Sequence, residues 1–371
     1  MVLDGAKERF GFGCMRLPMK GDHVDLKEFS KMVDKFIESG FNYFDTAHGY
    51  IRGESEKAIK KCLTSRYPRS AYLLTDKLTE PYFKKQEDIL PFIKSQLEAT
   101  GVDYFDYYLM HAQNSRNYEH FKKCHAYETA FEIKKQGLIR HVGISFHDTA
   151  EVLEQILSDY PEIEVVQIQF NYLDYESPSV QSHKLYDICK KHNKPIIVME
   201  PVKGGSLVNL PDAGKKVFDN LGGGSYASYA LRFALHFPQI AMVLSGMSDL
   251  PQMEDNVLST KDAEPLTDDE MIAIGEVRDI INGVSAIPCT KCRYCVEQNH
   301  CPANIPIPEI FSLYNTKRAF NDWNADFYYR NLTFGKNGKA SMCIKCGKCE
   351  KACPQHLTIR DYLVLCAKEF E

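Results

Sequence analysis

Near its C-terminal end the chain reads Cys343-Ile-Lys-Cys346-Gly-Lys-Cys349-Glu-Lys-Ala-Cys353-Pro354. A related run lies earlier, as Cys289-Thr-Lys-Cys292-Arg-Tyr-Cys295 followed after five residues by Cys301-Pro302. Three cysteines at this spacing can surround one face of a metal–sulfur cluster while their backbone amides point at its sulfides. Because a tight loop cannot surround the whole cluster, the fourth ligand has to come from another part of the chain.

The spacing of the later run is typical of [4Fe–4S] ligation, in which the last cysteine of each run binds the cluster of the other run. We therefore expect two [4Fe–4S] clusters. The expected ligands are Cys289, Cys292, Cys295 and Cys353 for one cluster, and Cys343, Cys346, Cys349 and Cys301 for the other. Structural zinc is the alternative, because it also uses Cys-x2-Cys pairs. Zinc would leave the third cysteine and the Cys-Pro of each run without a role, so we favour iron–sulfur clusters.

The residues that follow the two cysteine runs repeat as well. Apolar residues occupy positions 305, 307 and 310–311 after the first run, and 357, 359 and 362–363 after the second. These positions have the same offsets from Cys301 and from Cys353. The repeat predicts a ferredoxin-like module with internal two-fold symmetry, in which a short helix follows each run.

Length, charge and cysteine use limit the class of protein. The chain has 371 residues, which suits a large domain with a small module attached. Its net charge of −5 gives no footprint for nucleic acid. No apolar run is long enough to span a membrane and residues 1–10 lack a signal core, so we expect a cytoplasmic protein without membrane contact. Five of the 13 cysteines lie outside the runs without a pairing pattern, as in a reducing compartment.

Residues 1–260 alternate short apolar segments with segments of helical periodicity. The expected strands are 41–44, 72–75, 105–110, 141–145, 165–170, 195–199, 240–244 and one within 10–17. Helices are expected at 26–37, 86–99, 119–136, 149–157, 178–192, 225–236 and 250–258. Such alternation is typical of a parallel sheet covered by helices, and eight units in this length predict a (β/α)8 barrel. A doubly wound sheet is the alternative, although no Gly-x-Gly-x-x-Gly follows the first strand.

The remainder of the chain is expected to form a helical linker over 261–285 and a small α-helical two-cluster module over 286–371. Between Cys301 and Cys343 lie 41 residues rich in aromatic side chains. We expect this insert to be helical and its aromatic side chains to pack on the barrel.

Four polar residues follow successive barrel strands, where functional groups of such barrels lie. They are Asp45, Tyr50, Lys77 and His111. A phenol is a weak acid at neutral pH, but a nearby ammonium stabilises its phenolate and lowers its pKa. Tyr50 could then give a proton to a carbonyl oxygen as hydride reaches the carbon, with Lys77 held by Asp45 and the carbonyl oriented by His111.

These residues lie in segments that resemble the aldo/keto reductase family in order and spacing. The segments are Gly11-Phe-Gly-Cys-Met-Arg-Leu-Pro18, Phe44-Asp-Thr-Ala-His-Gly-Tyr50, Thr75-Asp-Lys77 and Leu109-Met-His111. The whole chain is similar to the family members that carry a C-terminal 4Fe–4S domain. The resemblance implies that Asp45, Tyr50, Lys77 and His111 form a catalytic tetrad. It also implies a carbonyl substrate, because family members that reduce carbon–carbon double bonds tend to carry Glu in place of this His.

The same resemblance implies where a nicotinamide nucleotide would bind, with departures from the family pattern. Ser145 is followed by Phe146 where Ser-Asn is usual, and Met199 replaces the usual stacking aromatic. Gln167 matches the family glutamine after the sixth strand. The acid–Asn pair of the last segment is kept as Asp255-Asn256.

The two cations that usually meet the 2′-phosphate of NADPH align with Gly246 and Gln252. Their loss removes charge-assisted bonds and argues against selectivity for NADPH. NADH, a flavin, or no tightly bound nucleotide are the alternatives. Backbone at Gly204 and Gly205 could approach a phosphate, and 222–225 could do so before a helix.

Three functions fit these features. The first is a reductase of a small carbonyl compound in which the clusters relay electrons, with a ferredoxin or another electron carrier as partner. The second is an electron-transfer or redox-sensing protein that uses the barrel as a scaffold. The third is a reductase whose clusters are purely structural.

Overall fold

The computed structural model describes the chain except for residues 116, 149, 177–179, 285, 290–292, 298–300, 321–323, 334–336 and 354. The chain forms two compact units. The first contains residues 1–204 and 224–267, and the second contains residues 205–223 and 268–371. The segment 261–285, expected as a linker, is therefore divided between the units, and most of it belongs to the second.

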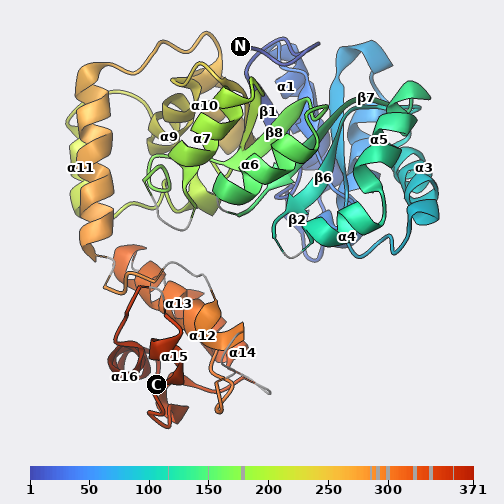
Figure 1. Cartoon of the computed structure of the whole chain (residues 1–371). Coiled ribbons are helices and arrows are strands. Elements are labelled where there is room, and N and C mark those ends of the chain that lie inside the picture. Colours follow the sequence, from blue (N-terminus) through green and yellow to red (C-terminus); the bar gives the residue numbers. More distant parts are fainter. Residues whose placement is uncertain are drawn as a thin grey trace. The chain divides into compact units, whose positions relative to one another are not determined.

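The first unit is built on a closed barrel of parallel strands, as predicted (Figure 1). Around the barrel run β1 (Phe10–Gly13), β4 (Tyr43–Asp45), β5 (Leu73–Leu78), β6 (Phe105–Gln113), β7 (Ile139–Phe146), β8 (Val165–Gln169), β9 (Ile196–Met199) and β10 (Ile240–Gly246). β1 pairs with both β10 and β4, which closes the sheet on itself. This closure confirms the (β/α)8 architecture over the doubly wound alternative.

Helices surround the barrel at the predicted places, and α2 is an additional helix that was not predicted. They are α1 (Leu26–Glu38), α2 (Glu54–Ile59), α3 (Ile89–Thr100), α4 (Tyr118–Lys123), α5 (Ala126–Lys135), α6 (Ala150–Asp159), α7 (Ser182–Lys191), α9 (Tyr226–Leu235) and α10 (Leu250–Thr260). The prediction of one helix over 119–136 was wrong. His125 has a φ of +49°, and this left-handed residue ends the hydrogen-bond ladder between α4 and α5. A hairpin of β2 (Met19–Lys20) and β3 (His23–Val24) follows β1.

Local chemistry explains the elements that position the site. Asp25 caps α1 by accepting bonds from two backbone amides, and the buried face of α1 follows a helical period. Inside the barrel, large side chains from different strands form one buried layer that includes Tyr43, Leu109 and Val165. Gly143 leaves the room this layer needs, because a Cβ there would lie 2.4 Å from Val165 Cγ1.

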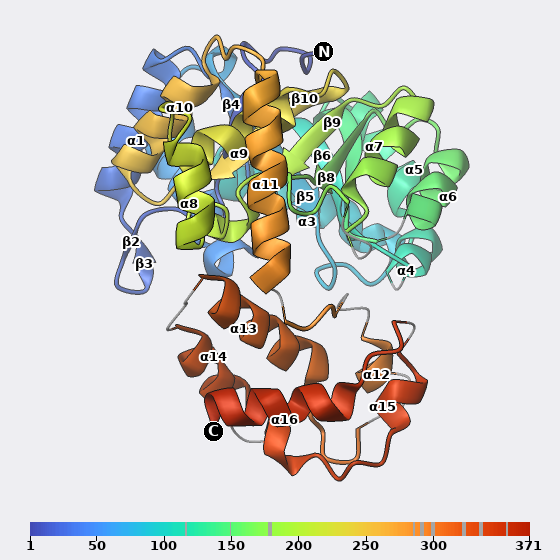
Figure 2. The ribbon, with the colours of Figure 1, turned by 90° about the vertical axis from the view of Figure 1, so that its left-hand side faces the viewer.

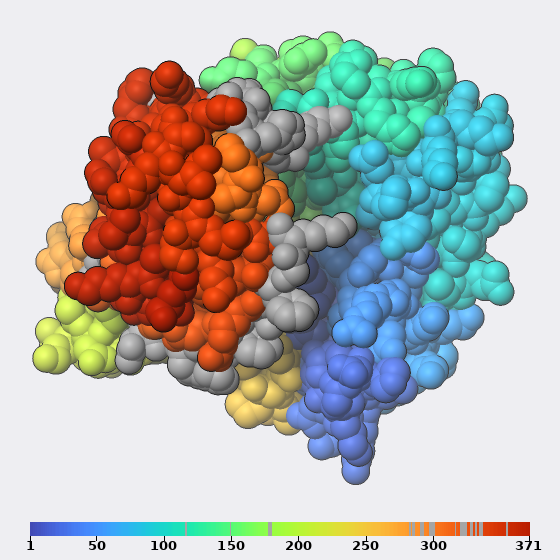
Figure 3. Space-filling view, turned by 90° about the horizontal axis from the view of Figure 1, so that it is seen from below, coloured from blue at the N-terminus to red at the C-terminus, as the bar shows by residue number. Residues whose placement is uncertain are grey.

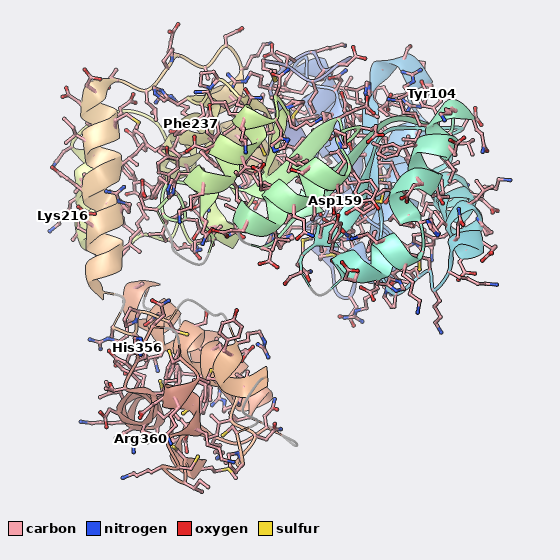
Figure 4. The ribbon with its side chains drawn as sticks, in the orientation of Figure 1. Tyr104, Asp159, Lys216, Phe237, His356 and Arg360 are labelled. Carbon is pink, nitrogen blue, oxygen red and sulfur yellow. The ribbon has the colours of Figure 1, made fainter. Side chains whose placement is uncertain are left out.

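The second unit is helical. It contains α8 (Asp212–Asp219), α11 (Asp268–Val284), α12 (Tyr294–Glu297), α13 (Ile307–Phe320), α14 (Asn324–Leu332), α15 (Lys348–Lys351) and α16 (Ile359–Phe370). α8 packs against α11, and α13 packs against α14 and α16 (Figure 2). Arg360 begins the exposed face of α16 and forms an ion pair with Glu350 of α15 at 2.8 Å (Figure 4).

The predicted repeat is present in the backbone of this unit. α13 begins six residues after Cys301 and α16 six residues after Cys353. Left-handed residues recur two positions before the third cysteine, at Arg293 and Gly347, and three positions after the fourth, at Asn304 and His356. α12 and α15 contain the third cysteine of each run and pack together. The two halves thus repeat the same chain path.

The aromatic insert was predicted to pack on the barrel, and for its buried described residues this was wrong. Phe311, Tyr314 and Tyr329 lie in the core of the second unit, together with Cys295, Cys349 and Cys353. Tyr329 also accepts a bond from the amide of Ala340 at 2.9 Å. A module this small has few other large apolar side chains from which to build a core. Trp323 lies outside the described residues.

Candidate active site and cluster cavity

Three strands bring the predicted tetrad to one end of the barrel. Asp45, Lys77 and His111 lie at or near the C-terminal ends of β4, β5 and β6. Tyr50 begins the turn after β4, in which Ile51 and Arg52 both have positive φ. Figure 3 shows one face of the molecule in space-filling form, on which the blue and cyan segments of the N-terminal half lie side by side.

Lys77 is the centre of the tetrad. Its Nζ lies 2.6 Å from Asp45 Oδ1, 2.7 Å from the carbonyl oxygen of Thr46 and 3.3 Å from Tyr50 Oη. Lys77 and Asp45 are both buried. The ammonium therefore donates to three oxygens, and one of them is the phenol that sequence reasoning named as the acid.

Burial and charge set the protonation states of this group. Burial alone would lower the pKa of Lys77, but Asp45 and Tyr50 outweigh it and the pKa lies above its ordinary value. Lys77 lowers the pKa of Tyr50 as expected, yet burial raises it more and Asp45 adds to the rise. The expectation of a net lowering was wrong. Tyr50 thus keeps its proton at neutral pH, which is the state a general acid requires.

His111 lies beside Tyr50, with ring centroids 6.0 Å apart. Its Nδ1 is 2.7 Å from Thr79 Oγ1, a contact that the sequence did not reveal. Burial lowers the pKa of His111 to about 3, and the charges of Lys77 and His147 act in the same direction. His111 is therefore neutral at physiological pH and has one ring nitrogen that can donate and one that can accept.

In the second unit, one cavity is lined by cysteines of both runs. Cys289 and Cys295 from the first run and Cys353 from the second line it, together with apolar residues that include Phe311 and Ile359. The crossed ligand assignment requires this combination. Among the described residues no group of three or more Cys, His, Asp or Glu is arranged for a single metal ion. The fit to a cluster therefore rests on the shared cavity. Cys292 lies outside the described residues.

The other predicted ligand set also combines the two runs. Burial raises the pKa of Cys349 to about 11, and the thiolates of Cys343 and Cys301 act on it in the same direction. Cys349 lies in the core of the second unit, and Cys301 and Cys343 pack against that core. Cys346 is exposed, unlike the other cysteines of the two runs within the described residues. The chemistry of both sets fits thiolate ligation of a [4Fe–4S] cluster.

Comparison with known proteins decides the family. The model of the Aldo/keto reductase family matches residues 9–279, and that of the 4Fe-4S dicluster domain matches residues 288–358. The chain belongs to the aldo/keto reductase family. It is an oxidoreductase whose second unit is an iron–sulfur domain, as predicted. No helix in the described part of this reductase is both long and apolar enough to cross a membrane.

Relatives and solved structures support this reductase assignment at modest identity. An uncharacterized oxidoreductase of Bacillus subtilis, YqkF, is 24% identical over 296 residues, which cover 71% of this chain and 90% of that protein. The NADH-specific methylglyoxal reductase of Escherichia coli is 24% identical over 47% of this chain and 57% of its own length. The holo form of aldo-keto reductase AKR11C1 from Bacillus halodurans has a TM-score of 0.59 and 25% identity, covering 72% of this chain and 91% of that chain.

Two of the residues expected at the nicotinamide also form hydrogen bonds at the predicted tetrad, to Asp45 and to Ala112 beside His111. Gln167 donates from Nε2 to Asp45 Oδ2 at 3.1 Å, opposite the oxygen that receives Lys77. Ser145 Oγ accepts a bond from the backbone amide of Ala112 at 2.8 Å. Ala112 follows His111 and has a φ of +52°, so Ser145 stabilises an unfavourable backbone conformation beside this histidine of the predicted tetrad.

The other residues expected to contact a nucleotide are arranged as follows. Asn256 is buried and donates to Ser245 Oγ at 3.0 Å. Asp255 accepts from Ser225 Oγ at 2.6 Å, while Ser225 also caps the N-terminus of α9. Met199 ends β9 and is partly buried.

Beside the turn after β9 lies a cation that sequence reasoning missed, Arg16 of the loop after β1. Arg16 extends over Gly246, whose Cβ would lie 3.3 Å from that of Arg16. Both terminal nitrogens of Arg16 lie 3.1 Å from Glu200 Oε1. Gly204 and Gly205 have φ values of +64° and +97°, a conformation without side chains in the way of an anion.

A second hydrogen-bond network begins at Asp76, the residue before Lys77. Asp76 is fully buried and accepts from the amide of Lys77 at 2.8 Å and from Gln96 Nε2 at 2.9 Å. The same Gln96 nitrogen lies 3.3 Å from Glu56, which also contacts His48 Nδ1 at 3.0 Å. Asp76 Oδ2 is buried without a donor. Burial and the neighbouring Glu56 raise the pKa of Asp76, so we interpret the two carboxyl groups as sharing a proton.

Proposed function

We propose that this protein reduces the carbonyl group of a small aldehyde, ketone or sugar at the mouth of the barrel. The observation that carries the proposal is the triangle of Lys77 Nζ with Asp45 Oδ1 at 2.6 Å and Tyr50 Oη at 3.3 Å. A buried ammonium in contact with a phenol makes proton donation possible at neutral pH, where a solvated phenol is inert. A reduced nicotinamide bound beside this triangle would supply the hydride.

Each residue of the tetrad has one task in this proposal. Tyr50 donates its phenolic proton to the carbonyl oxygen as the carbon is reduced. Lys77 stabilises the phenolate that remains, since its charge is the one influence that lowers the pKa of Tyr50 strongly. Asp45 holds Lys77 in place, and Gln167 holds Asp45. Neutral His111 hydrogen-bonds the substrate oxygen and sets its angle.

For the nucleotide we propose NADH. Gly246 and Gln252 stand where cations would meet a 2′-phosphate, and the remaining cation, Arg16, is occupied by Glu200. The relative that is an NADH-specific methylglyoxal reductase is consistent with this choice. The proposed contacts are Ser145, Gln167, Met199, Gly204, Gly205, Asp255 and Asn256.

For the second unit we propose two [4Fe–4S] clusters that relay electrons to or from a cofactor in the barrel. Cys289, Cys292, Cys295 and Cys353 would hold one cluster, and Cys343, Cys346, Cys349 and Cys301 the other. The support is the cavity lined by cysteines of both runs. A cluster passes single electrons whereas a nicotinamide passes hydride, so a flavin in the barrel would join the two kinds of chemistry.

The deciding experiment is performed on protein purified without air. Iron, sulfide and nucleotide content are measured first, followed by visible spectra with NADH, NADPH and dithionite. We expect NADH-dependent reduction of methylglyoxal, loss of at least a hundredfold in kcat for Tyr50→Phe, and unchanged binding of NADH. Tyr67→Phe is the matched control, because that phenol bonds Asp34 away from the mouth.

Four outcomes would count against parts of this proposal. Unchanged turnover in Tyr50→Phe would refute the role of the tetrad. If the purified protein contains flavin and NADH transfers no hydride, flavin rather than NADH would be the cofactor of the barrel. Clusters that no physiological donor reduces would favour a structural role, and electron exchange without any carbonyl turnover would favour an electron-transfer protein.

A further inference from the structure

The surface around the second cysteine run is strongly cationic in an acidic protein. Residues 339–360 contain five cations and a single carboxylate, Glu350, whereas the whole chain carries −5. Glu350 is already neutralised by Arg360 at 2.8 Å. Lys345, Lys348 and Lys351 are exposed, and within the described residues none of the three forms an ion pair. Their charges are therefore available to a partner.

The three lysines lie close together for a simple geometric reason. Lys348 and Lys351 are three residues apart on α15, which places their side chains on the same side of the helix. Lys345 precedes α15 across Gly347, whose φ of +72° turns the chain into the helix. All three lysines thus lie within seven residues of the chain, from 345 to 351.

Exposed apolar side chains accompany these charges. Ile344 is 65% exposed and Met342 is 53% exposed. Exposed apolar residues beside a ring of like charge are typical of a protein-binding surface, in which charge guides approach and apolar contact stabilises the complex. We name Met342, Ile344, Lys345, Lys348 and Lys351 the second-run surface.

The surface also contains the most accessible of the expected cluster ligands. Cys346 lies between Lys345 and Lys348 and is exposed, while the other described cysteines of the two runs are buried or partly buried. A cluster bound here would have its edge at this surface. The first run offers no equivalent patch among its described residues, because Arg293 is paired with Glu309 and Lys291 lies outside them.

We propose that the second-run surface docks a small acidic protein that carries one electron at a time. The inference rests on the proposed function, since it assumes that the clusters of this chain are redox-active. One electron passes from the reduced carrier to the cluster of the second run. The carrier is oxidised by one electron and this chain is reduced by one, and no bond forms or breaks and no proton moves.

Charge complementarity selects this partner over others. An acidic carrier is repelled by the net charge of the chain as a whole but attracted within about 10 Å of the lysines at 0.1 M salt. A basic carrier would be repelled at the second-run surface. Nucleic acid is less well matched, because the patch has no aromatic side chains with which to stack bases.

The test measures binding without turnover. The full-length protein with its clusters, and without substrate or nucleotide, is titrated calorimetrically with an oxidised acidic bacterial-type ferredoxin at 25, 100 and 300 mM salt. The test variant is Lys345→Glu/Lys348→Glu/Lys351→Glu. The control variant, Lys123→Glu/Lys190→Glu/Lys261→Glu, makes the same change in net charge at exposed barrel lysines.

We expect the test variant to bind the ferredoxin at least tenfold more weakly, with a flattened salt dependence, and the control variant to bind within threefold of the wild type. Iron and sulfide content must match the wild type. If the Glu variant loses its clusters, Lys345→Gln/Lys348→Gln/Lys351→Gln replaces it, with the same expected direction. Cytochrome c, a basic carrier, serves as the reverse probe and should bind no better to wild type than to the control variant.

Equal affinity of wild type and test variant, or an equal loss in the control, would overturn the proposal. Its failure is distinct from failure of the proposed function, because binding of an oxidised carrier requires neither Tyr50 nor carbonyl turnover. As a second readout, the rate at which reduced ferredoxin bleaches the cluster absorbance should fall with rising salt in wild type and stay flat in the test variant.

Discussion

At the residue scale, Lys77 is the point at which structure and proposed chemistry meet. It is buried, and its charge is compensated by Asp45 at 2.6 Å rather than by water. A buried ammonium that lost this partner would be strongly destabilised or would lose its proton. Each charge of the pair therefore compensates for the water that the other has lost. As a consequence, Tyr50 Oη has a charged ammonium 3.3 Å away.

Thr79 is a positioning residue for His111 in the proposed reaction. If its hydroxyl donates to Nδ1 across the 2.7 Å contact, the other ring nitrogen keeps the proton and can donate to a substrate oxygen. We expect Thr79→Val to lower kcat about tenfold with little change in KM, since one hydrogen bond is worth about 1 kcal/mol. Thr79→Ser should restore activity. Proton NMR of the His111 ring would report the tautomer, and an unchanged tautomer in Thr79→Val would refute this role.

The carboxyl group of Asp76 should make the free energy of unfolding depend on pH. Its pKa is raised in the folded protein, so folded chains keep a proton that unfolded chains lose above about pH 4. This contribution to stability is complete below that pH and is lost as pH rises through the folded-state pKa. Asp76→Asn keeps the acceptor for Lys77 and Gln96 but cannot ionise, so its stability relative to wild type should increase with pH.

Urea unfolding between pH 5 and 8 measures this difference. Asp76→Leu is the contrasting variant, because it leaves the Lys77 amide and Gln96 without an acceptor and should be destabilised by about 1–3 kcal/mol at every pH. Parallel stability curves for wild type and Asp76→Asn would show that the two carboxyl groups do not share a proton.

At the element scale, the apolar runs of the sequence predicted the positions of the strands. They did not predict the close contact between β7 and β8. The β7 residue Gly143 faces Val165 so closely that a Cβ would lie 2.5 Å from its carbonyl oxygen. The backbone of β8 cannot move away from Gly143 without breaking the pairing of β7 with β8. The broken helix at His125 is a similar case, because its local pattern is helical throughout.

We expect Gly143→Ala to destabilise the barrel by on the order of 3 kcal/mol, through overpacking against backbone. Gly275→Ala is the matched control on α11, where an added Cβ meets nothing within 4 Å. That change should stabilise its helix by about 0.5–1 kcal/mol, because alanine loses less conformational entropy than glycine. Thermal unfolding followed by circular dichroism measures the stability of both variants. A Gly143→Ala variant as stable as the wild type would contradict the close contact between β7 and β8.

At the scale of the whole molecule, the two units have separate cores of different character. The barrel core consists of large apolar side chains from many strands, such as Tyr43 and Leu109. The core of the second unit includes Cys295, Cys349 and Cys353 themselves. Clusters bound by these cysteines would therefore be part of that core, and their loss would remove much of what holds the unit together.

Removal of the clusters should consequently affect the units unequally. After treatment with ferricyanide and chelator, we expect loss of the cluster absorbance and of helical signal from the second unit. The barrel should keep its thermal transition within a few degrees and should still bind NADH. Cys366→Ala is the control, because Cys366 is buried in the same core but lies outside the two runs. Simultaneous unfolding of both units would contradict separate cores.

The sequence by itself determined the family, the barrel and the iron–sulfur domain, and it named the four residues of the proposed tetrad. Each of these follows from local spacing, because strand periods and ligand spacings are read along the chain. Only the tertiary structure showed that Gln167 and Ser145 contact Asp45 and Ala112, and that Thr79 contacts His111. It also showed that burial outweighs Lys77 at the phenol of Tyr50. These properties depend on distances between residues far apart in sequence and on the exclusion of water, and no local pattern contains either.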